Sequence, residues 1–182
     1  DAATWVGGAL PSPGDNVLIP DGVTLNVDAS VICNNLTIGQ GTSGVLSFTT
    51  SFNALTINGN LTLAANGRFN GYTSSVSPTA GGVQVNVAGN INIGSGAAIV
   101  MGHSSSILNM NGTSAQSING PGVFFSNLVR DLRLVNPTTI NVNVPITVNQ
   151  QFDMMTGTLN TNGNVTLDNG GQSYNQAANR QV

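Results

Sequence analysis

Apolar and polar residues alternate along short segments of this chain, and three of these segments begin with Gly-Asn. They are GNLTL at 59–63, GNINI at 89–93 and GNVTL at 163–167, and each follows another short alternating segment. Alternation with a period of two is typical of β-strands that bury one face. The residues that this alternation places inward are Leu61, Leu63, Ile91, Ile93, Val165 and Leu167.

Each Gly-Asn pair predicts a sharp corner between two strands. Glycine permits a left-handed backbone, and the asparagine amide can cap exposed backbone groups. Short strands joined by corners, rather than by helices or two-residue hairpins, favour a parallel β-helix whose coils stack on one another. With about 20 to 25 residues per coil, the expected fold is all-β, a right-handed parallel β-helix (solenoid) of about seven to nine irregular coils. The predicted corner residues are Gly59, Asn60, Gly89, Asn90, Gly163 and Asn164.

The chain is expected to form a single β-helix domain over 1–182. It divides into an N-terminal cap at 1–16, coils at 17–167 and a polar end at 168–182 after which more chain is expected, because this end shows no cap. The stretch 70–82 lacks alternation and predicts a protruding loop, the kind of segment that often carries binding. Further predicted strands are Val17–Ile19, Val23–Val27, Asn35–Ile38, Val45–Phe48, Leu132–Val135, Thr139–Val142 and Ile146–Val148.

Charged residues are scarce, with four basic and seven acidic residues among 182. This is far below the roughly one quarter of a usual soluble domain. Outward Asn and Thr side chains can replace the missing charges, because side chains stacked along the axis hydrogen-bond to one another and still face water. The net charge of −3 excludes a basic nucleic-acid binder. The longest apolar stretches are too short for a transmembrane segment.

Several single residues have a structural interpretation. Cys33 lies in the apolar run 31–33, which favours a small buried residue over a reactive thiol. Trp5 is expected to plug the first coil, with Pro11 and Pro13 stiffening this cover. The phenylalanines expected in the core are Phe48, Phe69, Phe124 and Phe152.

Three segments carry a family resemblance. They are TWVGGALPSPGDNVLIPDGVTLNVDAS with the NLTIGQG that follows, NGTSAQSINGPG at 111–122, and LRLVNPTTINVNVPITVNQQFDMMTGTLNTNGNVTL at 132–167. Together they resemble β-helical surface proteins secreted by Bacteroidota, and the first is loosely similar to the eight-glycine domain of extracellular proteins. The resemblance implies export by the type IX secretion system, with its translocon or shuttle as partner, and a secreted, extracellular or cell-surface location within a large, often adhesive protein.

Catalytic residues are not expected. The chain has no Glu or Lys, and nothing places an Asp beside its single histidine, His103. A lyase would need an Arg base and a cluster of Asp ligands for calcium. Asp15, Asp21 and Asp28 are the only closely spaced acids, and their spacing fits no compact metal loop. We therefore predict no enzyme activity, no metal site and no cofactor.

Asp131 and Arg133 alternate with leucines and are expected to form an outward surface pair. The sequence thus predicts a non-catalytic structural or adhesive segment of a secreted cell-surface protein. Exposed aromatic rings can stack on sugars, which makes Tyr72 and Tyr174 the expected glycan contacts.

Two alternatives stay open. One is a carbohydrate-binding or polysaccharide-degrading β-helix. The other is an ice- or surface-binding solenoid, which needs a regular outward array of threonines that Asn92 and Asn141 interrupt. The outward threonines are Thr37, Thr56, Thr62, Thr147 and Thr166.

Overall fold

The fold is known from a computed structural model that describes residues 4–6, 8–50, 53–73, 82–102, 105–168 and 172–174. Within these residues the regular secondary structure is almost entirely β-strand, from β1 to β19. Each strand pairs in parallel with strands of neighbouring turns. The prediction of an all-β, parallel architecture is therefore confirmed.

The strands stack in three columns, which the chain visits in turn. The first column is a seven-stranded sheet of β1 (Val17–Ile19), β4 (Leu36–Ile38), β7 (Leu61–Leu63), β10 (Ile91–Ile93), β13 (Gln116–Asn119), β15 (Thr139–Val142) and β17 (Thr158–Asn160). The second contains β2 (Thr24–Val27), β5 (Val45–Phe48), β8 (Arg68–Thr73), β11 (Ala98–Met101), the first parts of β14 (Val123–Leu134) and β16 (Ile146–Met154), and β18 (Val165–Leu167). The third contains β3 (Val31–Cys33), β6 (Ala54–Ile57), β9 (Gln84–Val87), β12 (Ile107–Met110), the second parts of β14 and β16, and β19 (Gln172–Tyr174).

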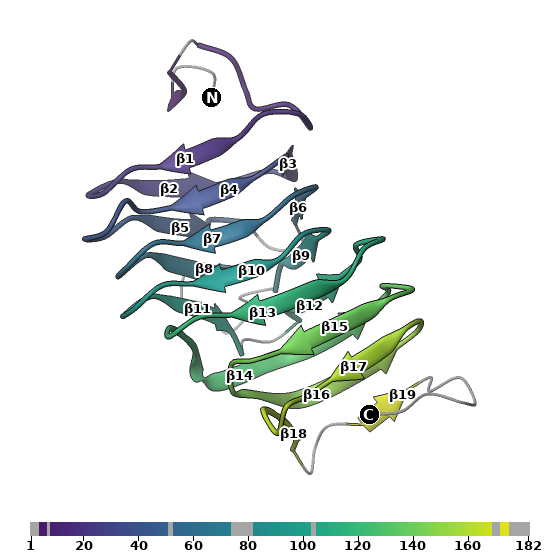
Figure 1. Cartoon of the computed structure of the whole chain (residues 1–182). Helices are drawn as coiled ribbons and strands as arrows, with labels where there is room; N and C mark the ends of the chain where they lie inside the picture. Colours follow the sequence, from purple (N-terminus) through teal and green to yellow (C-terminus); the bar gives the residue numbers. More distant parts are fainter. Residues whose placement is uncertain are drawn as a thin grey trace.

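The columns follow the order of the sequence. In Figure 1 the strands descend from purple β1 near the top to yellow β18 and β19 at the bottom, and each turn lies on the one before it. The second and third columns belong to one sheet, because β14 pairs first with β11 and then with β12. The result is a nearly closed parallel sheet, which is compatible with a β-helix.

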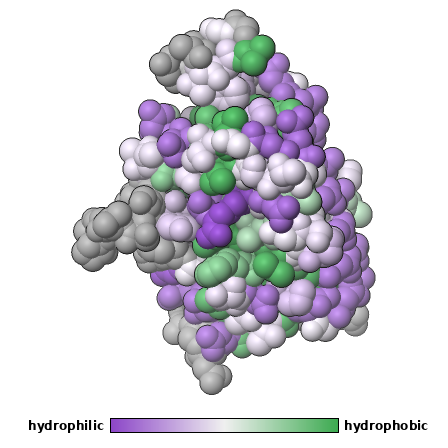
Figure 2. Space-filling view, turned by 90° about the vertical axis from the view of Figure 1, so that its left-hand side faces the viewer, coloured by the Kyte–Doolittle hydropathy of each residue, from purple (hydrophilic) through white to green (hydrophobic). Residues whose placement is uncertain are grey.

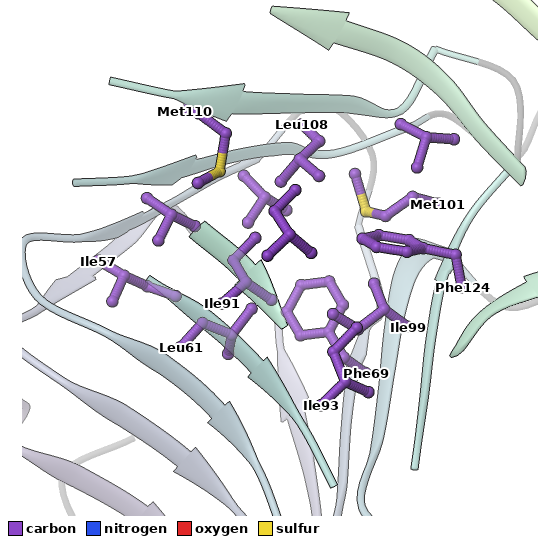
Figure 3. Packing of buried hydrophobic residues seen from close by; sticks show 14 of the residues in the cluster. Ile57, Leu61, Phe69, Ile91, Ile93, Ile99, Met101, Leu108, Met110 and Phe124 are labelled. Atoms are coloured by element: carbon purple, nitrogen blue, oxygen red, sulfur yellow. The ribbon is translucent and has the colours of Figure 1, made fainter. Parts of the chain in front are cut away.

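Inward side chains from the columns form one apolar core. Leu61 and Ile91 stand in register on neighbouring strands, and both are fully buried. The side chains labelled in Figure 3, which come from several turns, point toward one another between the strands. All four phenylalanines predicted for the core are buried there, and so is Cys33. The alternation in the sequence therefore reports directly which face of each strand is inside.

Asparagines tie one corner of each early turn to the next. The side-chain Oδ1 of Asn35 accepts a hydrogen bond from the backbone N–H of Asn60 at 2.7 Å, and Oδ1 of Asn60 accepts one from the N–H of Asn90 at 2.7 Å. Oδ1 of Asn90 then accepts a hydrogen bond from the N–H of Ser117 at 2.8 Å. At the start of the series, Oδ1 of Asn16 accepts one from the N–H of Asn35 at 3.3 Å. This corner ladder satisfies backbone donors that would otherwise lack a partner within the turn.

The corner glycines have two different physical roles. Gly163 has a φ of 76°, the left-handed conformation that was expected. Gly59 and Gly89 are not in that region, contrary to the expectation, and they are needed for close approach instead. A Cβ on Gly59 would lie 2.3 Å from Oδ1 of Asn35, so the ladder itself occupies the space of a side chain.

Asparagines also stack on the outer face of the first column in the later turns. The Nδ2 group of Asn143 donates to Oδ1 of Asn119 at 2.6 Å, and that of Asn162 donates to Oδ1 of Asn143 at 2.7 Å. A second pair joins Asn160 to Asn141 at 3.0 Å. These rows are the outward amide ladders that the composition predicts.

Two of the predicted boundaries are wrong. Residues 70–73 belong to β8 rather than to a loop, because this strand is paired with both β5 and β11. The rest of the predicted loop, apart from Gly82, lies outside the described residues. In the predicted polar end, β19 pairs with Gln151–Asp153 of β16 and so continues the third column.

The last described turn is less buried than predicted. Val165 is half-buried and Leu167 is exposed, although the alternation places both inward. β18 pairs only with β16 among the described residues, so no further turn covers its inner face there.

A cavity of about 300 Å³ lies between the N-terminal segment and the first turns. Trp5, Leu10 and Pro11 line it on one side, and Cys33 and Leu36 line it on the other. Trp5 is partly buried and packs against the core, in agreement with its predicted role as a cover. Most of the cavity lining is apolar. Burial raises the pKa of the Cys33 thiol to about 11, which keeps it protonated at neutral pH.

Replacing Ile91 with Asp should disrupt the core. An unpaired carboxylate at this fully buried position is expected to lower the free energy of unfolding by about 3 to 5 kcal/mol. Urea denaturation followed by circular dichroism measures this change. The control is Asn92→Ser on the outward side of the same strand, expected to stay within about 0.5 kcal/mol. Equal losses in both variants would contradict the assignment of the two faces.

Replacing Gly89 with Ala should strain the corner ladder. The added Cβ would lie 2.5 Å from the carbonyl carbon of Gly59, so the backbone must shift, at an expected cost of about 1 to 3 kcal/mol. The matched control is Gly14→Ala, where nothing lies within 4 Å of the added Cβ. Thermal melts of the two variants test the idea, which fails if Gly89→Ala melts at the wild-type temperature.

Candidate functional site

The glutamine of the Gly-Thr-Ser-Ala-Gln segment at 112–116 forms its hydrogen bonds inside the fold. Gln116 is buried, and its Oε1 accepts hydrogen bonds from the N–H of Gly112 at 2.9 Å and from Nδ2 of Asn136 at 2.8 Å. Its Nε2 donates to the carbonyl oxygens of Val87 and Gly89 in the preceding turn. The Gln116 side chain therefore locks turns together, and its polar atoms are not available to a ligand.

The acids near the N-terminus cap turns. Oδ1 of Asp21 accepts hydrogen bonds from the N–H groups of Gln40 at 2.7 Å and Ser43 at 3.1 Å, and Oδ2 of Asp15 accepts one from the N–H of Ser12 at 2.8 Å. These bonds lower the pKa of both carboxyl groups, that of Asp21 to about 2. Both carboxylates thus serve the turn geometry that the sequence predicts for them.

The expected surface pair of Asp131 and Arg133 is wrong. Nε of Arg133 instead lies 3.3 Å from Oδ2 of Asp153 on the next strand, and that oxygen also accepts a hydrogen bond from Gln151 at 2.9 Å. Asp131 is only 8% exposed, and burial raises its pKa despite the opposing charges of Arg130 and Arg133. Parallel pairing places Arg133 directly opposite Asp153, which explains the exchange of partners.

The two predicted glycan contacts are not brought together. Tyr72 is half-buried in β8, and Tyr174 lies in β19 of the third column. The strands β11, β14 and β16 separate them along the sheet. His103 lies outside the described residues. Within those residues, no group of three His, Cys or acidic side chains is placed to hold a metal ion.

The outer face of β8 carries a row of polar side chains. Arg68, Asn70 and Tyr72 alternate with the inward residues Phe69 and Gly71 along this strand. Nε of Arg68 donates to Oδ1 of Asn70 at 2.8 Å. The Nδ2 group of Asn70 in turn donates to the Ser47 hydroxyl at 2.9 Å, which holds the row in place.

A bulge in β14 presents an aromatic ring beside this row. Phe124 pairs with Ile99 of β11, and the next pair on that side is Val129 with Met101, so the four residues Phe125–Leu128 lie opposite Val100 alone. Ser126 and Asn127 in this bulge have φ values of 55° and 56°, in the left-handed region that non-glycine residues rarely adopt. Such bulges often redirect a side chain next to a functional site.

Phe125 and Arg68 meet on this face. Phe125 is 52% exposed, and the Arg68 Cζ atom lies over its ring, 5.7 Å from the centroid. Val123, two residues before Phe125 on the same strand, is 44% exposed. We call this set, with Asn70 and Val100, the Arg68–Phe125 surface. Figure 2 faces the side that carries the connections between the first and second columns, and it shows hydrophobic surface there next to strongly hydrophilic surface.

Arg68 has no carboxylate partner on this surface. The ion pair between Arg133 and Asp153 is the one found in the described part of the chain. The Arg68–Phe125 surface therefore combines an exposed ring with a cation that no acidic side chain among those residues neutralises. Sequence reasoning missed Phe125. The available signal was the pair Phe124-Phe125, because a strand that buries one phenylalanine must turn the next one outward.

The outward threonines do not form a regular array. Thr37 and Thr62 are neighbours in the first column, but Leu18 precedes them in the same row and Asn92 follows. This row therefore lacks the repeated spacing of one residue type that an ice-binding face requires.

None of the known protein families, curated proteins or solved structures with which the chain was compared matches it. No helix in the described ranges combines the length and the hydropathy needed to cross a membrane.

The stability of the protein should fall in acid because of Asp21. The pKa of the Asp21 carboxyl is about 2 in the folded state and near 3.8 as an ordinary side chain. At a pH between these two values, the carboxylate is protonated in the unfolded state and stays ionised in the folded state. The contribution of Asp21 is present above about pH 4 and is lost as the pH falls toward 2. In urea melts from pH 6 to pH 2.5, Asp21→Asn should show a smaller acid loss than the wild type.

The control for this experiment is Asp28→Asn, since the Asp28 carboxylate has no hydrogen-bond partner in the part of the chain that the structure describes. It should keep the acid loss of the wild type. An identical acid loss in the wild type and Asp21→Asn would contradict the role assigned to Asp21.

Proposed function

We propose that this chain is a right-handed parallel β-helix that serves as a non-catalytic structural and adhesive segment of a secreted cell-surface protein. The observation that carries the proposal is the stacking itself. Inward aliphatic residues continue from turn to turn along the seven strands of the first column, and outward asparagine rows join its later turns. Such a solenoid can hold a binding surface at a distance from the cell.

The contacts of three acidic residues favour a structural role over catalysis. Asp15 and Asp21 accept hydrogen bonds from backbone amides, and Asp153 is paired with Arg133. Export by the type IX secretion system, with its translocon or shuttle as partner, rests on the resemblance of the sequence to Bacteroidota surface proteins.

Adhesion is supported by the Arg68–Phe125 surface. Exposed apolar patches with a polar rim often mark binding sites, and Phe125 and Val123 form an exposed apolar pair beside Arg68 and Asn70. A ring next to hydrogen-bonding side chains is also what a sugar-binding surface needs. This surface, rather than Tyr174, is the place where we expect a glycan to bind, with Tyr72 at the end of the same strand.

A glycan array probed with the chain, with and without calcium, tests this function. We expect retention of at least one class of glycan, independent of calcium, and mass spectrometry of the bound glycan should show no cleavage. Cleaved products would contradict the non-catalytic assignment. Absence of binding to every glycan would contradict adhesion to carbohydrate and leave a purely structural segment.

A further inference from the structure

We propose that the Arg68–Phe125 surface binds an acidic saccharide, with one sugar stacked on the Phe125 ring and its carboxylate or sulfate held by the Arg68 guanidinium. The inference rests on the adhesive function proposed above and names its ligand class. It draws on three features of this surface: the bulge, the unneutralised cation and the polar row of β8.

The exposed ring of Phe125 stands at the start of the bulge. Without the extra residues of Phe125–Leu128, β14 would follow β11 in simple register. Two consecutive left-handed residues, Ser126 and Asn127, maintain the bulge, and each is expected to cost about 1 kcal/mol or more. Strain of this kind, placed directly after an exposed aromatic residue, is typical of a position shaped for binding rather than for packing.

The cation selects the charge of the ligand. An arginine presents five N–H donors in a planar fork that matches a carboxylate or sulfate with two parallel hydrogen bonds. Hydrogen bonding of Nε to Asn70 fixes the plane of the Arg68 guanidinium, and its terminal nitrogens remain the groups suited to an anion. The guanidinium lies over the Phe125 ring, with Cζ 5.7 Å from the centroid, so a single sugar unit against the part of the ring that stays exposed can also reach the cation.

The surroundings favour a sugar over other anions. The net charge of −3 and the scarcity of basic residues disfavour nucleic acid, which requires many phosphate contacts. Around the cation, Asn70 and Ser47 supply an amide and a hydroxyl, which are the groups that pair with sugar hydroxyls. Val100 and Val123 complete the apolar floor beside the ring.

Titration calorimetry of the whole chain tests the proposal with three probes: an oligogalacturonate, a sulfated galactan oligosaccharide and a neutral galactan oligosaccharide. We expect binding of a charged probe that weakens with added salt, and little binding of the neutral one. The two charged probes distinguish a carboxylate from a sulfate as the group that Arg68 recognises, and binding of either supports the proposal.

Two variants localise the binding. Arg68→Gln and Phe125→Ala should each weaken the binding of the charged probe by at least tenfold, while Phe125→Tyr, which keeps the ring, should retain it. The matched controls are Arg130→Gln, which removes the same charge outside this surface, and Met155→Ala, which removes another exposed apolar side chain, 48% exposed. Circular dichroism establishes that each variant is folded.

The failures can be told apart. Equal binding of the charged probe by the wild type, Arg68→Gln and Phe125→Ala would overturn this site but leave glycan adhesion intact. Binding of the neutral probe that depends on Phe125 and not on Arg68 would overturn the acidic class alone. Absence of binding to all three probes overturns this inference, and the glycan array then decides whether adhesion to carbohydrate survives.

Discussion

The whole structure depends on hydrogen bonding between equivalent positions of successive turns. Parallel strands pair residue for residue, so inward leucines and isoleucines stack on one another, as Leu36, Leu61 and Ile91 do. The same register brings asparagines of successive corners within reach of the next backbone amide. Because the corner donors are satisfied by side chains, the chain can turn without helices or hairpins, and the core stays closed to water.

This constraint explains the unusual composition. A repeated row of like charges would repel along the axis, whereas a repeated row of amides attracts, so asparagine can occupy equivalent positions in turn after turn, as Asn119, Asn143 and Asn162 do. The corner glycines follow from the same rule, since the asparagine ladder fills the space beside Gly59. At the point where β14 breaks the register, Phe125 lies on the outward side of the strand and is exposed.

Much of this architecture could be predicted from the sequence, because period-two alternation and stacking are local properties. The strands Val45–Phe48 and Thr139–Val142 agree with the predicted bounds end to end. Strands such as Ala98–Met101 and Ile107–Met110 lack a Gly-Asn corner and were missed. The partner of Arg133 and the contact of Phe125 with Arg68 depend on register between distant turns, which the sequence does not encode locally. The role of Gly59 likewise depends on a side chain one turn away.

Residue-resolved hydrogen exchange measured by NMR tests the corner ladder most directly. The account predicts that the amides of Asn60, Asn90 and Ser117 exchange as slowly as the amides of the adjoining strands, because each donates to an asparagine oxygen one turn earlier. In Asn60→Ala, the Asn90 amide should exchange much faster while the Asn60 amide stays protected. Exchange of all three amides at the rate of exposed loops in the wild-type protein would contradict the claim that cross-turn hydrogen bonds hold the corners together.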